Sequence, residues 1–243
     1  MKAERNIAAR EAILGSIREH LLASRPHDAI HAEGAHDGPA EVKASELSLE
    51  PPPPNGAAAS LVEVFEENLR SVGGNAVAAD GEDGIVAALN TIISGLQQTR
   101  LRGRRIALSD APGLDRLLSR LKVEVDEIKT SPSAGELFDY DVGISMVQAA
   151  IAETGTLLLE SESERHRLVS LVPPVHIAIV NVADICLTLG EALAAVGRGN
   201  DLSATITLIT GPSRTADIEL TLAIGVHGPQ ELYVIVNVGD PLV

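Results

Sequence analysis

The chain has 243 residues, 45% of them hydrophobic, which is enough for one large domain or two small domains with a real core. Aromatic residues make up only 2%, so the core must be built from aliphatic side chains. The formal net charge is −15, and an acidic surface repels phosphate backbones. The chain also has few aromatic rings on which bases could stack. Nucleic acid is therefore not expected as a partner.

The cysteine count and the length of the apolar runs further limit which kinds of protein this chain can be. Cys186 is the one cysteine of the sequence, so no intramolecular disulfide can form, and an iron–sulfur cluster or structural zinc site lacks its ligands. We expect the chain to bind neither a cofactor nor a metal ion. No apolar run approaches the ~20 residues that span a bilayer, and the charged N-terminus does not look like a signal peptide. The predicted location is the cytoplasm.

The N-terminal quarter divides into two segments. Apolar residues at helical spacing over 3–24 predict an amphipathic helix in residues 1–25, and Pro26 ends it. Residues 26–59 are rich in Ala, Gly, His and Pro and include four consecutive prolines from Pro51, which is typical of a linker. An α/β domain is predicted over 60–243.

Within 60–243, apolar strands alternate with amphipathic helices. Ser60 and Glu63 form a capping-box pattern at the start of a helix that Gly73 ends. Later helices are predicted around 85–96, 112–121 and 183–196, and strands at 76–79, 105–108, 123–128, 142–147, 151–159, 175–180, 204–209 and 232–236. This alternation predicts the α/β class, with a central, largely parallel sheet flanked by helices on both faces.

Common cofactor and nucleophile motifs are absent: the sequence contains no G-x-G-x-x-G after a strand, no P-loop, no H-E-x-x-H and no G-x-S-x-G. Polar segments that interrupt apolar strands are therefore the candidates for chemistry. In the first segment, Glu153 precedes Thr154 and Gly155 within an apolar stretch. It is either a buried carboxyl with a raised pKa or a strand-edge carboxylate that accepts bonds from backbone amides.

The second segment places His176 after two prolines, at the entrance of a buried strand. A histidine there is either a satisfied core residue or a candidate base. The third segment runs from Gly211 through Ser213, Arg214 and Thr215 to Asp217, and Gly225-Val226-His227-Gly228-Pro229 follows it.

A strand followed by Gly-Pro-Ser-Arg-Thr suits an anion, because hydroxyls, amides and a guanidinium converge there. Ligands of α/β sheets bind beyond the carboxyl ends of the strands, which is where we expect this segment. Arg214 either grips the anion or pairs internally with Asp217 or Glu219.

Taken together, four ordered segments resemble the lactate-utilization (LUD) domain, and the short, cysteine-poor chain resembles its protein C branch. They are 152–156, 171–176, 211–219 and 225–229. The resemblance covers about 60–243 and is strongest after Asp141. It implies a fold similar to the sugar-phosphate isomerase and coenzyme A transferase group. It also implies a part in oxidising L-lactate to pyruvate, in concert with partner proteins that carry iron–sulfur clusters.

Two readings of the function follow from the residues and the resemblance. In the first, the chain is a cluster-free component of the lactate-oxidising system. Arg214, with Ser213 and Thr215, then holds a carboxylate, His227 or His176 is the base, and Glu153 orients its neighbours. In the alternative, the chain is a free-standing acyl- or phosphate-handling enzyme that uses Glu153, by analogy with coenzyme A transferases. A non-catalytic regulator and a homo-oligomer are also compatible with the sequence.

Overall fold

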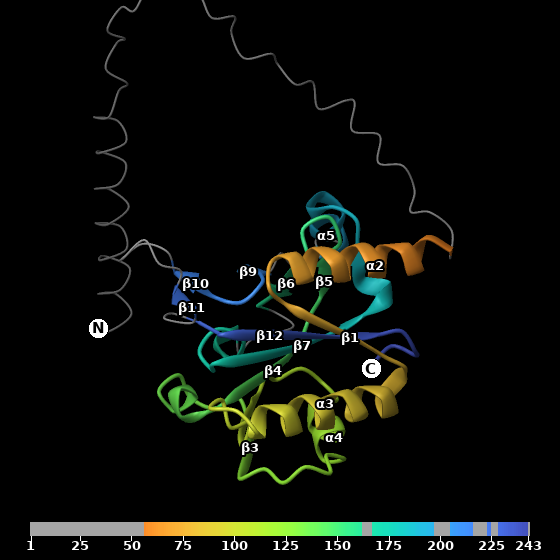
Figure 1. Cartoon of the computed structure of the whole chain (residues 1–243). Coiled ribbons are helices and arrows are strands. Elements are labelled where there is room, and N and C mark those ends of the chain that lie inside the picture. The colour runs from red at the N-terminus through yellow and green to blue at the C-terminus, as the bar shows by residue number, and fades with distance from the viewer. Residues whose placement is uncertain (1–55, 162–166, 197–204, 216–222, 225–227, 243) are drawn as a thin grey trace, which may run out of the picture. The chain divides into compact units, whose positions relative to one another are not determined.

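A six-stranded parallel sheet is the centre of the structure (Figure 1). The computed structural model describes residues 56–161, 167–196, 205–215, 223–224 and 228–242. In spatial order the strands are β1 (Asn75–Ala79), β12 (Glu231–Asn237), β7 (Val175–Asn181), β4 (Val142–Met146), β2 (Arg105–Leu108) and β3 (Glu127–Thr130). The predicted fold class is confirmed, since helices flank this parallel sheet. Part of one face, however, is covered by a second sheet.

Helices α3 (Gly81–Gln97) and α4 (Leu114–Leu118) cover one face of the parallel sheet (Figure 1). The buried cluster between these helices and the sheet is aliphatic. In it the apolar stripe of α3 packs against alternate residues of the strands. On β7 these residues are Val175, Ile177 and Ile179, none of which has exposed surface.

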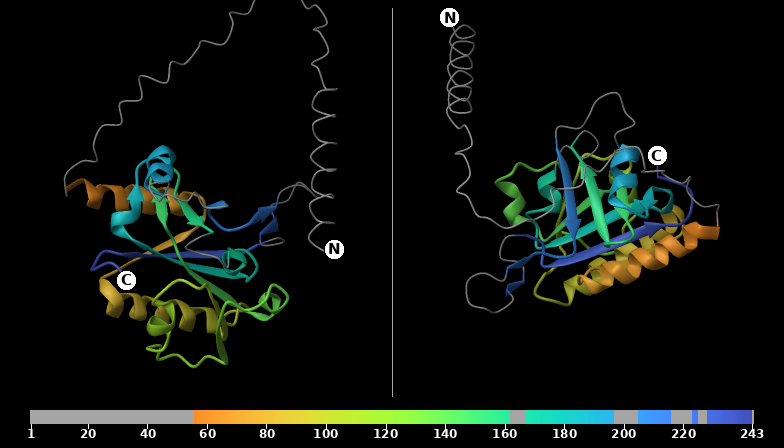
Figure 2. Two further views of the ribbon diagram at one scale, coloured as in Figure 1. Left: turned by 180° about the vertical axis from the view of Figure 1, so that it is seen from behind. Right: turned by 90° about the horizontal axis from the view of Figure 1, so that it is seen from above.

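Helix α2 (Gly56–Ser71) and a four-stranded mixed sheet cover the opposite face, as the views in Figure 2 also show. In spatial order the mixed sheet contains β8 (Ile185–Cys186), β5 (Ala149–Ile151), β6 (Thr156–Glu160) and β9 (Ile206–Thr210). Helix α5 (Leu189–Val196) packs on β5 and β8. Phe65 and Leu69 of α2 are fully buried here, with alternate residues of β7 and β12.

Shorter elements complete the described chain. Three 3-10 helices are η1 (Glu136–Asp139), η2 (Arg167–Ser170) and η3 (Val182–Asp184). Strands β10 (Arg214–Thr215) and β11 (Ala223–Ile224) form an antiparallel pair. Within the described ranges, no helix combines the length and the apolar character needed to cross a bilayer.

Several element boundaries differ from the predictions. Helix α2 begins at Gly56, so Ser60 lies inside it and the predicted capping box is wrong. The predicted end is confirmed: Gly73 has φ +89°, and the Gly74 amide donates to the carbonyl oxygen of Leu69 at 2.9 Å. A β3 strand at 127–130 replaces the one predicted at 123–128. The predicted N-terminal helix and linker, 1–25 and 26–59, lie outside the described residues except for 56–59.

Two predicted continuous elements are interrupted. The stretch 151–159 is an antiparallel hairpin of β5 and β6, because Gly155 adopts φ +62° in the connecting turn. The predicted helix 183–196 is divided into η3, β8 and α5. In both cases apolar composition was read as one element, while tertiary pairing with a neighbouring strand decided the outcome.

Candidate functional site

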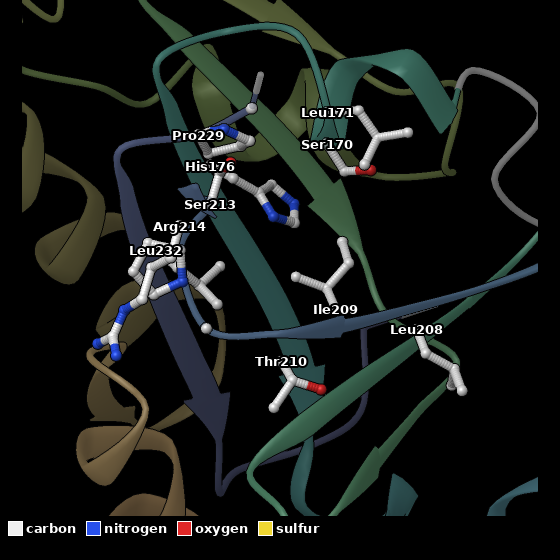
Figure 3. Close-up of a pocket in the computed structure, with 13 residues that line it drawn as sticks. Ser170, Leu171, His176, Leu208, Ile209, Thr210, Ser213, Arg214, Pro229 and Leu232 are labelled. Carbon is white, nitrogen blue, oxygen red and sulfur yellow. The ribbon is translucent and has the colours of Figure 1, made fainter. Parts of the chain in front are cut away.

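A pocket of about 340 Å³ lies between the parallel sheet and the second sheet (Figure 3). It is bounded by the start of β7, the start of β12, the end of β9 and the loop after β9. Its lining consists of Ser170, Leu171, His176, Leu208, Ile209, Thr210, Gly211, Pro212, Ser213, Arg214, Gly228, Pro229 and Leu232. Four of the predicted site residues are therefore brought together: His176, Gly211, Ser213 and Arg214.

The pocket is at the amino ends of the parallel strands, not at the carboxyl ends. His176 is the second residue of β7 and Leu232 the second residue of β12. The Gly-Pro-Ser-Arg segment follows β9, which pairs antiparallel with β6 in the second sheet. The rule for open parallel sheets therefore does not locate this pocket, and our expectation of a carboxyl-end site is wrong for this segment.

The segment 211–214 is held against the C-terminal end of α2. Gly211 has φ +76°, and a Cβ there would lie 2.5 Å from the Val72 carbonyl oxygen, so only glycine allows this approach. The Arg214 guanidinium donates to that same carbonyl at 2.8 Å. A cation at a helix C-terminus is favourable, because the carbonyl groups there carry partial negative charge.

The side chain of Arg214 is exposed and points away from the imidazole of His176 (Figure 3). Its partner in the structure is a backbone carbonyl. Asp217 and Glu219, the predicted internal partners, lie outside the described residues, as does His227. Thr215 is in β10, where its backbone pairs with Ala223.

His176 forms the floor of the pocket and has no exposed surface. Its Nε2 is 2.9 Å from the hydroxyl oxygen of Ser145, which is 1% exposed. No protein group among the described residues bonds its Nδ1. Burial lowers the pKa of His176 to about 3, because a charged imidazolium in this apolar space would lose its hydration. The ring is therefore neutral near pH 7.

Strand register explains why Ser145 and His176 meet. On the parallel pair β4 and β7, Gly143 is opposite His176 and Ser145 is opposite Ala178, so the serine and histidine side chains share one face. Gly143 also lets η2 lie directly on the sheet, since a Cβ there would be 1.9 Å from the Val169 carbonyl oxygen. This close approach brings Ser170 to the pocket.

The Glu153 segment is not part of the pocket lining. Glu153 is exposed, and its Oε1 accepts a bond of 3.4 Å from the Leu189 amide, so the strand-edge alternative describes it and the buried alternative does not. A Cβ on Gly155 would be 2.3 Å from the Leu69 amide nitrogen, which shows that this glycine allows the turn to pack on α2.

A line of hydroxyls nevertheless connects the Glu153 segment to the pocket rim. Oγ1 of Thr154 is 2.7 Å from that of Thr156, which is 2.8 Å from that of Thr210 in the lining. Thr156, Thr210, Ser145 and Ser170 were not predicted as site residues. For Ser145, Thr156 and Thr210 the sequence signal was a polar residue within an apolar strand, whereas Ser170 lies in η2.

The structure thus defines an α/β protein with a small pocket between its two sheets. A family model described as the LUD domain matches residues 62–236, and the chain belongs to that family. Lactate utilization protein C of Deinococcus radiodurans is 37% identical over 119 residues, 48% of this chain and 56% of that protein. The same-named protein of a Geobacillus species is 37% identical over 140 residues, 53% of this chain and 58% of the relative.

An uncharacterized protein of Neisseria meningitidis is 41% identical over 123 residues, 48% of this chain and 49% of that protein. The chain thus spans about half the length of the curated relatives it matches. A crystal structure of a DUF162-family protein from Deinococcus radiodurans has a TM-score of 0.50 and 25% identity. The match covers 74% of this chain and 98% of that one.

Proposed function

We propose that this chain is a component of a lactate-utilising system and binds a small carboxylate, such as lactate or pyruvate, in the pocket between its sheets. The observation that carries the proposal is the charge of the pocket. The described residues of its lining include one charged side chain, the cation Arg214, although the chain carries a net charge of −15. An acidic surface with a single cation at a concave site favours a small anion there.

The lining also suits the rest of such a molecule. Hydroxyls of Thr210 and Ser213 can bond carboxylate or hydroxyl oxygens, while leucine and isoleucine side chains offer a surface for a methyl group. A volume of about 340 Å³ is at the small end of ligand pockets. Arg214 has five N–H donors, and the bond to the Val72 carbonyl uses one of them. The guanidinium can therefore keep this bond and also contact a carboxylate ligand.

The names of the relatives support lactate utilisation, and the remaining parts of the proposal rest on the family resemblance. Oxidation of lactate to pyruvate releases two electrons, and the one cysteine of this chain cannot ligate a cluster to accept them. We therefore propose that partner proteins carry iron–sulfur clusters. The alternative enzyme that uses Glu153 has less support, because its carboxylate is exposed and outside the pocket lining.

Calorimetric titration of the purified chain with L-lactate, pyruvate and phosphate tests the binding. Arg214→Ala should weaken carboxylate affinity about ten- to a hundredfold, the effect of losing a charge-assisted contact. Arg214→Lys should recover only part of it, because an ammonium cannot reproduce the planar fork. Lactamide, the neutral analogue, should bind weakly to every variant.

Arg116→Ala is the matched control, because it also removes an exposed arginine, one in α4 that pairs with Glu82 of α3 on the opposite face. Its affinity should equal that of the wild type. If Arg214→Ala lowers the melting temperature but leaves affinity unchanged, its role is to hold the end of α2, and the binding proposal is wrong. Native co-purification with proteins that show iron–sulfur absorption tests the partner half of the proposal.

A further inference from the structure

The pairing of Ser145 with His176 determines what the pocket floor can offer a ligand. Both side chains are buried, and one contact of 2.9 Å joins the serine oxygen to Nε2. That contact has two forms. Either the hydroxyl donates to a bare Nε2, or a protonated Nε2 donates to the hydroxyl oxygen.

Counting buried donors and acceptors separates the two forms. If Nε2–H donates, the serine proton has no acceptor among the contacts of the described residues, and the Nδ1 lone pair also has none. If the hydroxyl donates to Nε2, the serine proton is used, and Nδ1–H is the one group of this pair that has no partner among the described residues. Buried polar groups without partners are costly, so the second form is favoured.

We propose that Ser145 is a positioning residue: its hydroxyl donates to Nε2 of His176 and holds the imidazole in the Nδ1–H form, so that the pocket floor presents a hydrogen-bond donor to a carboxylate or keto oxygen of the ligand. The ligand half of this inference rests on the pocket binding a small carboxylate, as proposed above, and it requires a shift of neighbouring side chains, because Nδ1 is buried. The tautomer half concerns the protein alone.

The surroundings of the ring agree with a donor and not with a base. Figure 3 shows the imidazole projecting from β7 into the space beside Ser213, Ser170 and Ile209. Among the described lining residues no carboxylate is present that would stabilise an imidazolium. A ring that stays neutral at pH 7 and already uses Nε2 accepts a proton poorly, but it can donate from Nδ1 without any change of charge. His227 then remains the candidate base.

The test is nitrogen NMR of the full chain labelled with ¹⁵N-histidine, first without ligand. His176 is assigned as the signal that disappears in His176→Gln. We expect a protonated, pyrrole-type Nδ1 and a bare, pyridine-type Nε2. In Ser145→Ala the Nε2–H form, which imidazole side chains prefer in water, should gain population. Ser145→Thr, which keeps a hydroxyl, should restore the wild-type spectrum.

Titration with pyruvate then tests the donor. The Nδ1–H proton resonance should move on binding, and Ser145→Ala should lose about tenfold or more in affinity. Ser109→Ala, which removes a buried serine hydroxyl without a partner in the described part of the chain, is the matched control and should change neither readout.

The outcomes separate the two proposals. An Nε2–H tautomer in the ligand-free wild type overturns this inference and leaves carboxylate binding intact. Normal pyruvate affinity in Ser145→Ala also overturns the donor role. If no carboxylate binds the wild type, the proposed function fails and the ligand half of this inference fails with it, whereas the NMR tautomer stands as measured.

Discussion

The two faces of the parallel sheet are built from the same strands but have different chemistry. The face under α3 is covered by a continuous aliphatic cluster, from Ile85 and Leu89 to Ile177. The face under the second sheet contains buried polar side chains, Ser145 and His176, and borders the pocket. On β7 the change occurs from one residue to the next, since alternate side chains point to opposite faces.

The difference is between a dry face that helices cover and a face that borders a pocket. A helix can cover a sheet face with a dry stripe, because the backbone groups between its two ends are bonded within the helix. The second sheet leaves a space beside the starts of β7 and β12, and polar side chains line part of it. The pocket can therefore vary in chemistry while the opposite face holds the structure together.

The largest expected effect is a comparison of two buried leucines. Leu89→Ala on the dry face should cost about 3–5 kcal/mol in free energy of unfolding, because the cavity it leaves is sealed. Leu232→Ala beside the pocket should cost about 2–3 kcal/mol, because that space is already open to solvent. Urea unfolding measures both, and equal costs would contradict the distinction between the faces.

The next effect is the pH dependence that His176 gives to the pocket face. Its folded pKa of about 3 is below its unfolded value of 6.5, so only the unfolded state takes up a proton as the pH falls between them. Stability should therefore fall by about 2 kcal/mol from pH 7 to pH 5 on account of this residue. Above pH 6.5 the imidazole is mostly neutral in both the folded and the unfolded state, so this loss of stability is absent there.

Urea unfolding of the wild type and His176→Gln at each pH measures this contribution as a difference of slopes. Near pH 5, His176→Gln should take up about one proton fewer on unfolding than the wild type does, whatever its absolute stability. Identical slopes would mean that the imidazole is accessible to protons in the folded state.

The smallest effect concerns the buried hydroxyl of Ser109. Ser109, at the carboxyl end of β2, is 1% exposed, and its Oγ has no partner among the described residues. Ser109→Ala should leave the free energy of unfolding unchanged or raise it by up to about 1 kcal/mol, because an unsatisfied polar group is removed. A clear loss of stability would show that this hydroxyl makes a bond.

The sequence by itself determined the fold class, because apolar periodicity is a local property that each segment carries alone. The helix end at Gly73 and the strands around 105–108, 142–147, 175–180 and 232–236 were predicted for this reason, and the structure confirms them. The polar segment from Gly211 was also predicted to follow an apolar strand, and it follows β9.

Only the tertiary structure decided which residues meet. Ser145 and His176 are 31 positions apart, and Thr156 and Thr210 are 54 apart. Each pair depends on strand order, register and face, which follow from packing across the whole domain and not from neighbours in the chain. For the same reason Glu153, which the sequence placed near a glycine, lies outside the pocket lining. Gly211, Ser213 and Arg214 line the pocket because the segment 211–214 packs against the C-terminal end of α2.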